Sequence, residues 1–105
     1  MKRRFYVTFE MESEVIGRGV IELDQRVIDA VDDEWHDMIT DSINTPEEIA
    51  QFIAFNMVIN HANLNSIDGF ADLTNDLAIM IEWPEGLDNY DVIAKEIPHR
   101  TGAGW

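Results

Sequence analysis

Apolar residues occupy every second position near the start of the chain: Phe5, Val7, Phe9 and Met11. This period of two is typical of a strand that buries one face. A Gly17-Arg18-Gly19 turn follows, and the segment from Val20 to Leu23 has the composition of a second, shorter strand. The opening of the chain therefore predicts a β-hairpin whose loop glycines allow positive φ angles.

The hydrophobic pattern becomes helical after Asp24, a residue type that suits the N-cap of a helix. Apolar residues then share one stripe of the helical wheel, about 120° wide. They are Val27, Ile28, Val31, Trp35, Met38 and Ile39. This stripe predicts one helix that continues to about Asp41, with Trp35 in the core and acidic side chains on the opposite side.

A second helix has a strong start signal. Thr45 can cap it, Pro46 takes the first helical position, and Glu48 completes a capping box. Apolar residues then surround the helical wheel: Ile49, Phe52, Ile53, Phe55, Met57, Val58 and Ile59. We therefore expect a central, buried helix that runs to about Ala62.

Alternation returns in a third predicted strand. Leu77, Ile79, Ile81 and Trp83 alternate with Ala78, Met80 and Glu82. We expect Trp83 on the inward face of this strand and a stop at Pro84-Glu85-Gly86. Either edge of the hairpin can accept the strand. The pattern also allows a short C-terminal helix from about Asp91 to Ile97, and we expect residues 98–105 to form a flexible tail.

This order of elements, β-β-α-α-β, predicts a two-layer α+β fold in which helices cover one face of a small antiparallel sheet. The chain has no internal repeat, so we expect a single domain over residues 1–97. A hydrophobic content of 46% excludes a disordered chain, because disordered chains are poor in apolar residues.

The chain carries a large excess of acidic residues. The chain has 21 acids and 7 bases, a formal net charge of −14. Between Val27 and Ala94 there are fifteen Asp and Glu residues and neither Lys nor Arg. A field of one sign destabilises a fold by self-repulsion and attracts a partner of the opposite sign. The composition therefore predicts a basic partner, and it disfavours binding to nucleic acid or to anionic lipid.

The first predicted helix concentrates this charge. Asp29, Asp33, Asp37 and Asp41 recur every fourth residue, about 6 Å apart along a helix axis. With Asp32 and Glu34 they form a predicted ridge with about one charge per 3 Å, close to the 3.4 Å of one strand of duplex DNA. Further acids extend this surface: Glu47, Glu48, Asp68, Asp72 and Asp76.

These residues predict a non-enzymatic inhibitor that occupies the cationic nucleic-acid-binding surface of a target protein. In charge and size the chain resembles the small acidic inhibitors that viruses and mobile elements use against restriction, CRISPR, repair or nucleoid proteins, some of which imitate DNA. The resemblance implies an anti-defence or host-takeover role in the cytoplasm of a host cell. No motif transfers individual residues from a known family.

Two alternatives stay open at the level of sequence. The acids can serve solubility alone, in which case the chain is an adaptor or assembly module that binds through an apolar and aromatic surface. Phe70, in a polar connection, is then a candidate exposed anchor, because aromatic residues are enriched at interface centres. It can equally fold back as a plug over the core.

Enzyme chemistry has little support in the sequence. There is no cysteine, no recognisable nucleophile motif, no phosphate-binding loop and no paired-histidine metal spacing. Residues 63–69 fail as a calcium loop, because Leu64 and Asn75 stand where Asp and Glu are required. We expect Asp68 and Asn75 to cap backbone groups, His36 to be a surface residue and His61 to lie near a helix end. No cofactor, metal, export signal or membrane segment is expected.

Overall fold

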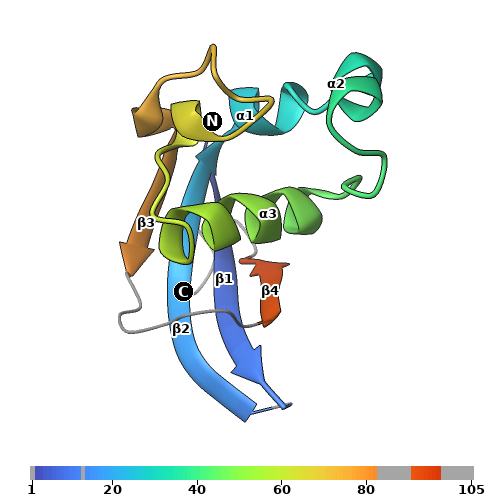
Figure 1. The fold of residues 1–105 in the computed structure, drawn as a ribbon. Coiled ribbons are helices and arrows are strands. Elements are labelled where there is room, and N and C mark those ends of the chain that lie inside the picture. The colour runs from blue at the N-terminus through green and yellow to red at the C-terminus, as the bar shows by residue number, and fades with distance from the viewer. Residues whose placement is uncertain (1, 13, 83–90, 98–105) are drawn as a thin grey trace, which may run out of the picture.

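The computed structural model describes residues 2–12, 14–82 and 91–97 (Figure 1). Four strands form one antiparallel sheet in the order β3-β2-β1-β4. They are β1 (Lys2–Met11), β2 (Glu14–Asp24), β3 (Ala78–Glu82) and β4 (Asp91–Glu96). The helices are α1 (Gln25–Asp29), α2 (Asp33–Met38) and α3 (Pro46–Val58), with single 3₁₀ turns η1 (Leu64–Ser66) and η2 (Asn75–Leu77).

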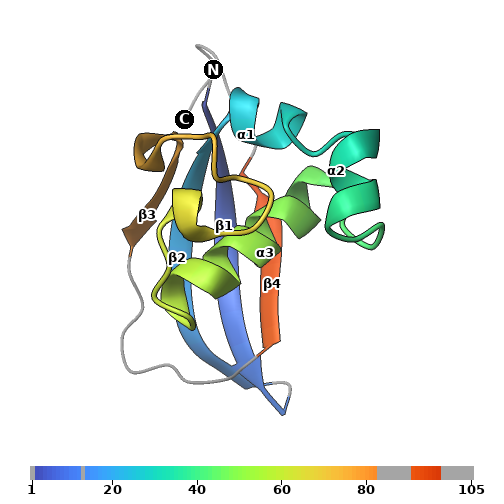
Figure 2. The same cartoon turned by 45° about the horizontal axis from the view of Figure 1, so that its top comes forward.

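The predicted α+β class with a small antiparallel sheet is confirmed. Figures 1 and 2 show α3 lying across one face of the sheet, with α1 and α2 beyond one end of it. The buried side chains of the strands, among them Phe5, Val7, Phe9, Ile21 and Leu23, face this helical layer and form the core with α3. None of the helices in the described residues is long and apolar enough to cross a bilayer.

The hairpin is longer than the sequence predicts. Its strands pair from Lys2 opposite Asp24 to Met11 opposite Glu14, so the turn lies near Glu12, which has a positive φ of 53°. The predicted turn at Gly17–Gly19 is wrong, because both glycines lie within β2. Gly17 faces Phe9 across the ladder and Gly19 faces Val7.

The third strand pairs with β2 and has the opposite phase to the one predicted. Ala78 and Met80 are buried, whereas Ile79 and Ile81 point outward and are exposed. Because this strand has apolar residues on both sides, alternation alone does not determine which side faces the core. The pairing with β2 determines the inward side. Trp83, the predicted stop at residues 84–86 and the predicted tail at 98–105 lie outside the described residues.

The predicted C-terminal helix is wrong, because Asp91–Glu96 is strand β4 on the free edge of β1. Val92 pairs opposite Phe9 and Ala94 opposite Val7. The edge of β1 offers unpaired backbone groups, and satisfying them outweighs the weak local preference for a helix. The sheet is completed by a segment far from the hairpin in sequence.

The prediction of a single first helix is also wrong, because the structure has two short helices, α1 and α2, in its place. Asp24 caps α1 as predicted, since its side chain accepts a hydrogen bond from the Arg26 backbone at 3.0 Å. The chain then leaves helical geometry before Asp32, which caps a separate helix, α2, by accepting from the Trp35 backbone N–H at 2.9 Å. A side chain that competes for backbone hydrogen bonds ends one helix and starts the next. The predicted ridge of Asp29, Asp33, Asp37 and Asp41 is therefore not continuous.

Helix α3 has the predicted capping box at Thr45 and Glu48. It ends at Val58, because His61 adopts a left-handed φ of 54° and the Ala62 N–H bonds the Asn56 carbonyl at 2.9 Å. The helix is not buried all round. One face packs on the sheet through Ile49, Ala50, Ile53, Ala54, Met57 and Val58, whereas Phe52 and Phe55 are half-buried on other sides.

An aromatic cluster joins α2, α3 and the following connection. The ring of Phe70 lies 5.6 Å from that of Trp35 and 6.4 Å from that of Phe52, measured between centroids. Phe70 is 1% exposed. It is therefore a plug over the core, and the prediction of Phe70 as a partner-binding residue is wrong.

Candidate partner-binding surface

Eleven acids predicted as partner-binding residues lie on the helical layer, and we call them the helical-layer acids. They are Asp29, Asp32, Asp33, Glu34, Asp37, Asp41, Glu47, Glu48, Asp68, Asp72 and Asp76. Nine are exposed, and Glu47 and Glu48 are half-buried in the first turn of α3. They occupy the helices, their caps, the segment between α2 and α3, and the connection to β3. The charge is thus spread over a layer and is not confined to one helix.

The structure brings some of these acids close to one another. Asp33, Glu34 and Asp37 share α2, with Asp32 as its cap. Gly69, the neighbour of Asp68, packs against Trp35 of α2, so the connection that carries Asp68 meets α2 at this point. Acids from two separate segments of the chain therefore belong to one part of the helical layer.

The helical-layer acids form no ion pair among the described residues. The four ion pairs there use only Glu22, Asp24 and Glu96 as their acids. The shortest joins Arg3 Nε to Glu96 Oε2 at 2.6 Å. Four of the six described bases, Lys2, Arg3, Arg4 and Arg26, form these pairs, so within the described residues no ion pair neutralises a helical-layer acid.

Most of the described bases lie on a different side of the molecule. In the strand register, the positions of Phe5, Val7 and Phe9 face the helices, so the intervening positions face away. Those outward positions hold Lys2, Arg4, Arg18 and Lys95. The other two described bases are Arg3, on the inward side of β1, and Arg26, on α1. The helical side of the molecule is therefore rich in acids and poor in bases.

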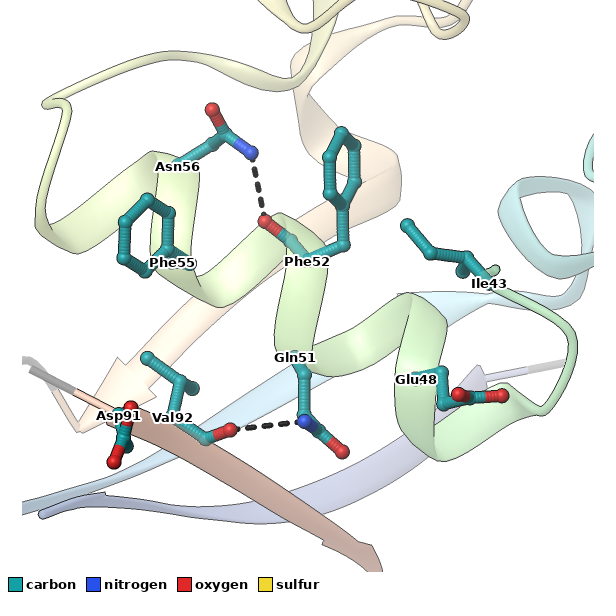
Figure 3. A pocket seen from close by; sticks show the side chains of 8 residues that line it. All are labelled: Ile43, Glu48, Gln51, Phe52, Phe55, Asn56, Asp91 and Val92. Atoms are coloured by element: carbon teal, nitrogen blue, oxygen red, sulfur yellow. Dashed lines mark hydrogen bonds between the residues drawn. The ribbon is translucent and has the colours of Figure 1, made fainter. Parts of the chain in front are cut away.

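A groove opens beside the helical layer, between α3, the segment before it, and β4 (Figure 3). Its volume is about 510 Å³, within the range of small-ligand or side-chain sites. Its lining residues are Ile43, Glu48, Gln51, Phe52, Phe55, Asn56, Asp91 and Val92. Apolar surface from two phenylalanines is thus combined with two carboxylates and no base.

Side-chain hydrogen bonds fix the walls of the groove. The Gln51 amide donates to the Val92 carbonyl at 2.9 Å, which ties α3 to the edge strand β4 (Figure 3). The Asn56 amide donates to the Phe52 carbonyl at 2.8 Å. The His36 ring donates through Nε2 to the Ile43 carbonyl at 2.6 Å, so this histidine holds the segment before α3 against α2. The expectation of a surface histidine without a role is wrong.

Glu48 is a positioned carboxylate on the wall of the groove. Its Oε1 accepts from the backbone N–H groups of Asn44, at 3.1 Å, and Thr45, at 3.0 Å. These hydrogen bonds lower the pKa of Glu48, because they favour the ionised form. The capping box therefore fixes a negative charge at this end of the groove, while Asp91 lies on the β4 side.

The ionisable side chains that line the groove are the carboxylates Glu48 and Asp91. Its lining residues include no serine, cysteine, lysine or histidine. Within the described residues, no three side chains of the metal-binding types converge on a point. The Asn75 side chain accepts from the Asn65 backbone N–H at 3.1 Å, which confirms its predicted role in the connection. A cationic group with apolar parts fits the groove best.

The groove was not predicted from the sequence. Phe52 lies four residues after Glu48, and Phe55 and Asn56 lie three and four residues after Phe52, so they share one side of α3. The polar residues Glu48 and Asn56 on the same side as two phenylalanines were the sequence signal that this side of α3 is open to solvent. Comparison with known proteins finds no matching family model, and no significant match among curated sequences or solved structures.

Proposed function

We propose that this chain is a non-enzymatic binding protein whose helical layer docks on a cationic surface of another protein. The supporting observation is the excess of acids on the helical layer: eleven helical-layer acids without an ion pair in the described residues, next to a groove lined by Phe52 and Phe55. The partner class is a nucleic-acid-binding protein, because its binding surface is the kind that is both broad and cationic.

Electrostatics and apolar contact have different roles in this proposal. The uncompensated acids accelerate encounter with a basic surface and orient it, an effect that falls with ionic strength. The groove supplies short-range affinity, since an aliphatic or aromatic side chain can bury against Phe55 while a Lys or Arg reaches Glu48. The two parts together select a basic surface with a protruding amphipathic side chain.

The consequence for the target is competition. A protein whose nucleic-acid-binding surface is covered by the helical layer cannot hold DNA or RNA there, so binding inhibits it. A continuous helical ridge no longer supports this proposal, because α1 and α2 are separate helices. What supports it is an acidic layer that extends from α1 to the connection before β3. An anti-defence inhibitor encoded by a virus or mobile element fits this activity.

The second candidate function is an adaptor that binds through apolar surface, its acids serving solubility. One observation favours it: seven of the eight exposed large hydrophobic side chains lie on the strands, and only Met38 lies on a helix. The candidates make opposite predictions, since an adaptor tolerates charge reversal in the helical layer and loses its partner when the sheet surface is altered.

The test is capture of proteins from a host lysate on the immobilised chain, followed by elution with a salt gradient. The proposal predicts that a nucleic-acid-binding protein elutes as salt rises from about 0.1 M to about 0.5 M, where screening is strong. Duplex DNA added before capture prevents its binding. A captured partner that is indifferent to both salt and duplex contradicts the proposal and favours the adaptor.

A further inference from the structure

The outward face of the sheet breaks the usual alternation of a one-sided antiparallel sheet. Such a sheet places apolar residues toward the core and polar residues toward water. Here β3 turns Ala78 and Met80 inward but also turns Ile79 and Ile81 outward. On β4, Ala94 is buried and the neighbouring Ile93 is exposed.

These outward apolar side chains are substantially exposed. Tyr6 is 39% exposed, Ile79 41%, and both Ile81 and Ile93 47%. In the strand register, Tyr6 lies between Val20 on β2 and Lys95 on β4, while Ile93 lies opposite Thr8. All four strands therefore contribute to one open surface, and no helix of the described residues covers it (Figures 1 and 2). Exposed apolar side chains from several strands on one uncovered face make it a candidate interaction site.

We infer that a second copy of this chain packs on this outward face, sheet against sheet, to form a symmetric dimer. A two-fold dimer needs a self-complementary surface, because each patch meets its own copy. The outward face meets this requirement, since it combines apolar residues with both signs of charge. Its bases are Lys2, Arg4, Arg18 and Lys95, and its acids are Glu10, Glu22 and Glu82.

Charge also selects the second copy over contact through the helical layer. Two chains with a net charge of −14 each repel one another, and the helical-layer acids are the main source of repulsion. Packing through the outward faces, about 10 Å apart, leaves the two helical layers on opposite sides of the dimer. They are then separated by more than a Debye length of about 8 Å, so their repulsion is screened.

The area of the sheet is adequate for a reversible dimer. At about 3.3 Å per residue and about 4.8 Å between strands, the four strands cover roughly 500 Å² in projection. Side-chain relief raises the accessible area toward the ~800 Å² that each partner contributes to a standard interface. An interface of this size predicts a concentration-dependent dimer.

This inference depends on the sheet alone and not on the proposed function, and salt distinguishes the two. Capture of a basic partner by the helical layer weakens as salt rises. Dimerisation strengthens, because apolar burial holds the dimer and screening removes the repulsion between two acidic chains. If capture of a basic partner fails, dimerisation can still be observed, and if dimerisation fails, capture can still be observed.

The experiment is sedimentation velocity on the full chain over a range of concentrations, at about 0.05 M and about 0.5 M NaCl. We expect a monomer–dimer equilibrium in which the dimer dissociation constant falls several-fold at the higher salt. Ile93→Lys and, separately, Ile79→Lys abolish the dimer, because each buries an unpaired charge in the interface. Met38→Lys is the matched control: it changes a 67% exposed hydrophobic residue on α2 and preserves the dimer.

Circular dichroism of each variant separates loss of the dimer from loss of the fold. A wild-type chain that remains monomeric up to about 1 mM overturns the inference, since even a dissociation constant near 1 mM gives measurable dimer there. A dimer that persists in folded Ile93→Lys and Ile79→Lys also overturns it. A dimer lost only in Met38→Lys places the contact on the helical layer and contradicts it equally.

Discussion

The Cα atom of Gly69 lies against the indole ring of Trp35. A Cβ on this glycine would stand 2.8 Å from Trp35 Cε2 and would overlap Nε1. Gly69 also has a φ of 93°, which side chains of L-residues rarely adopt. Trp35 is 3% exposed, and its Nε1 has no hydrogen-bond partner among the described residues. The contact fixes the connection before β3 onto α2, and with it the acids of that connection.

The Gly69→Ala variant is therefore expected to be destabilised by about 2–4 kcal/mol, from backbone strain and overpacking together. Urea unfolding followed by tryptophan fluorescence measures the loss. Asp68→Ala is the control, because Asp68 is the exposed neighbour and its truncation should change the free energy of unfolding by less than about 0.5 kcal/mol. Equal stability of the glycine and alanine forms at position 69 would contradict the close approach of Gly69 to Trp35.

The stability of the chain should fall at acid pH through the Arg3–Glu96 pair. The Arg3 guanidinium donates to the Glu96 carboxylate from Nε at 2.6 Å and from Nη2 at 2.7 Å. These hydrogen bonds lower the pKa of Glu96 below its ordinary value of 4.5. A group with a lowered pKa stabilises the fold fully above its unfolded pKa and loses that contribution as pH falls through its folded pKa. The pair therefore loses its contribution to stability as the pH falls below about 4.5.

Glu96→Gln tests this pair directly. Its free energy of unfolding should be lower than that of the wild type at pH 7, and the difference should shrink as pH falls below about 4.5. Because the pair is partly exposed, we expect a loss of no more than about 1 kcal/mol. Urea titrations at a series of pH values measure it. A constant difference between the two proteins from pH 7 to pH 3 would contradict the assignment.

Local signals in the sequence predicted local structure well. The capping box of Thr45 and Glu48 and the N-cap at Asp24 depend on residues within one helical turn, and the structure confirms both. The two strands at the start are also confirmed, although the turn between them is not at Gly17–Gly19. A glycine pair that permits a turn does not require one when its neighbours can continue a ladder.

Features that depend on distant partners were not predictable. Asp91–Glu96 becomes a strand only because β1 has a free edge, and the phase of Ile79 depends on pairing with β2. The groove is missing from the sequence interpretation for the same reason. Phe52 and Phe55 are apolar, and only the tertiary arrangement determines which sides of α3 the sheet covers.

The two phenylalanines of the groove should separate binding from stability. Phe52 packs edge-on against Trp35, with ring centroids 6.2 Å apart, so Phe52→Ala should cost about 2–3 kcal/mol of stability. Phe55 has no such aromatic partner in the described cluster, and Phe55→Ala should cost about 1 kcal/mol. We expect Phe55→Ala to weaken binding of a captured basic partner by about tenfold or more.

Met38→Ala is the control for the groove variants, because Met38 is exposed on the helical layer but lies outside the groove. Isothermal titration with the captured partner measures each affinity, and urea unfolding measures each stability. Unchanged affinity in Phe55→Ala removes the groove from the binding surface and leaves only the acids.

The most direct test of an acidic helical layer as the binding surface is a comparison of two matched charge reversals. Asp33→Lys with Asp37→Lys changes two exposed acids of α2, and Glu12→Lys with Glu14→Lys changes two exposed acids at the hairpin tip. Both pairs alter the net charge equally. The measurement is the affinity of each double variant for the captured basic partner at about 0.15 M salt.

If the helical layer is the binding surface, the α2 reversal weakens this affinity by about tenfold or more, whereas the hairpin-tip reversal changes it by less than about threefold. The α2 variant must also lose the ability to compete with duplex DNA for the partner. Equal loss in the two double variants would mean that net charge alone attracts the partner, and would contradict a binding surface on the helical layer.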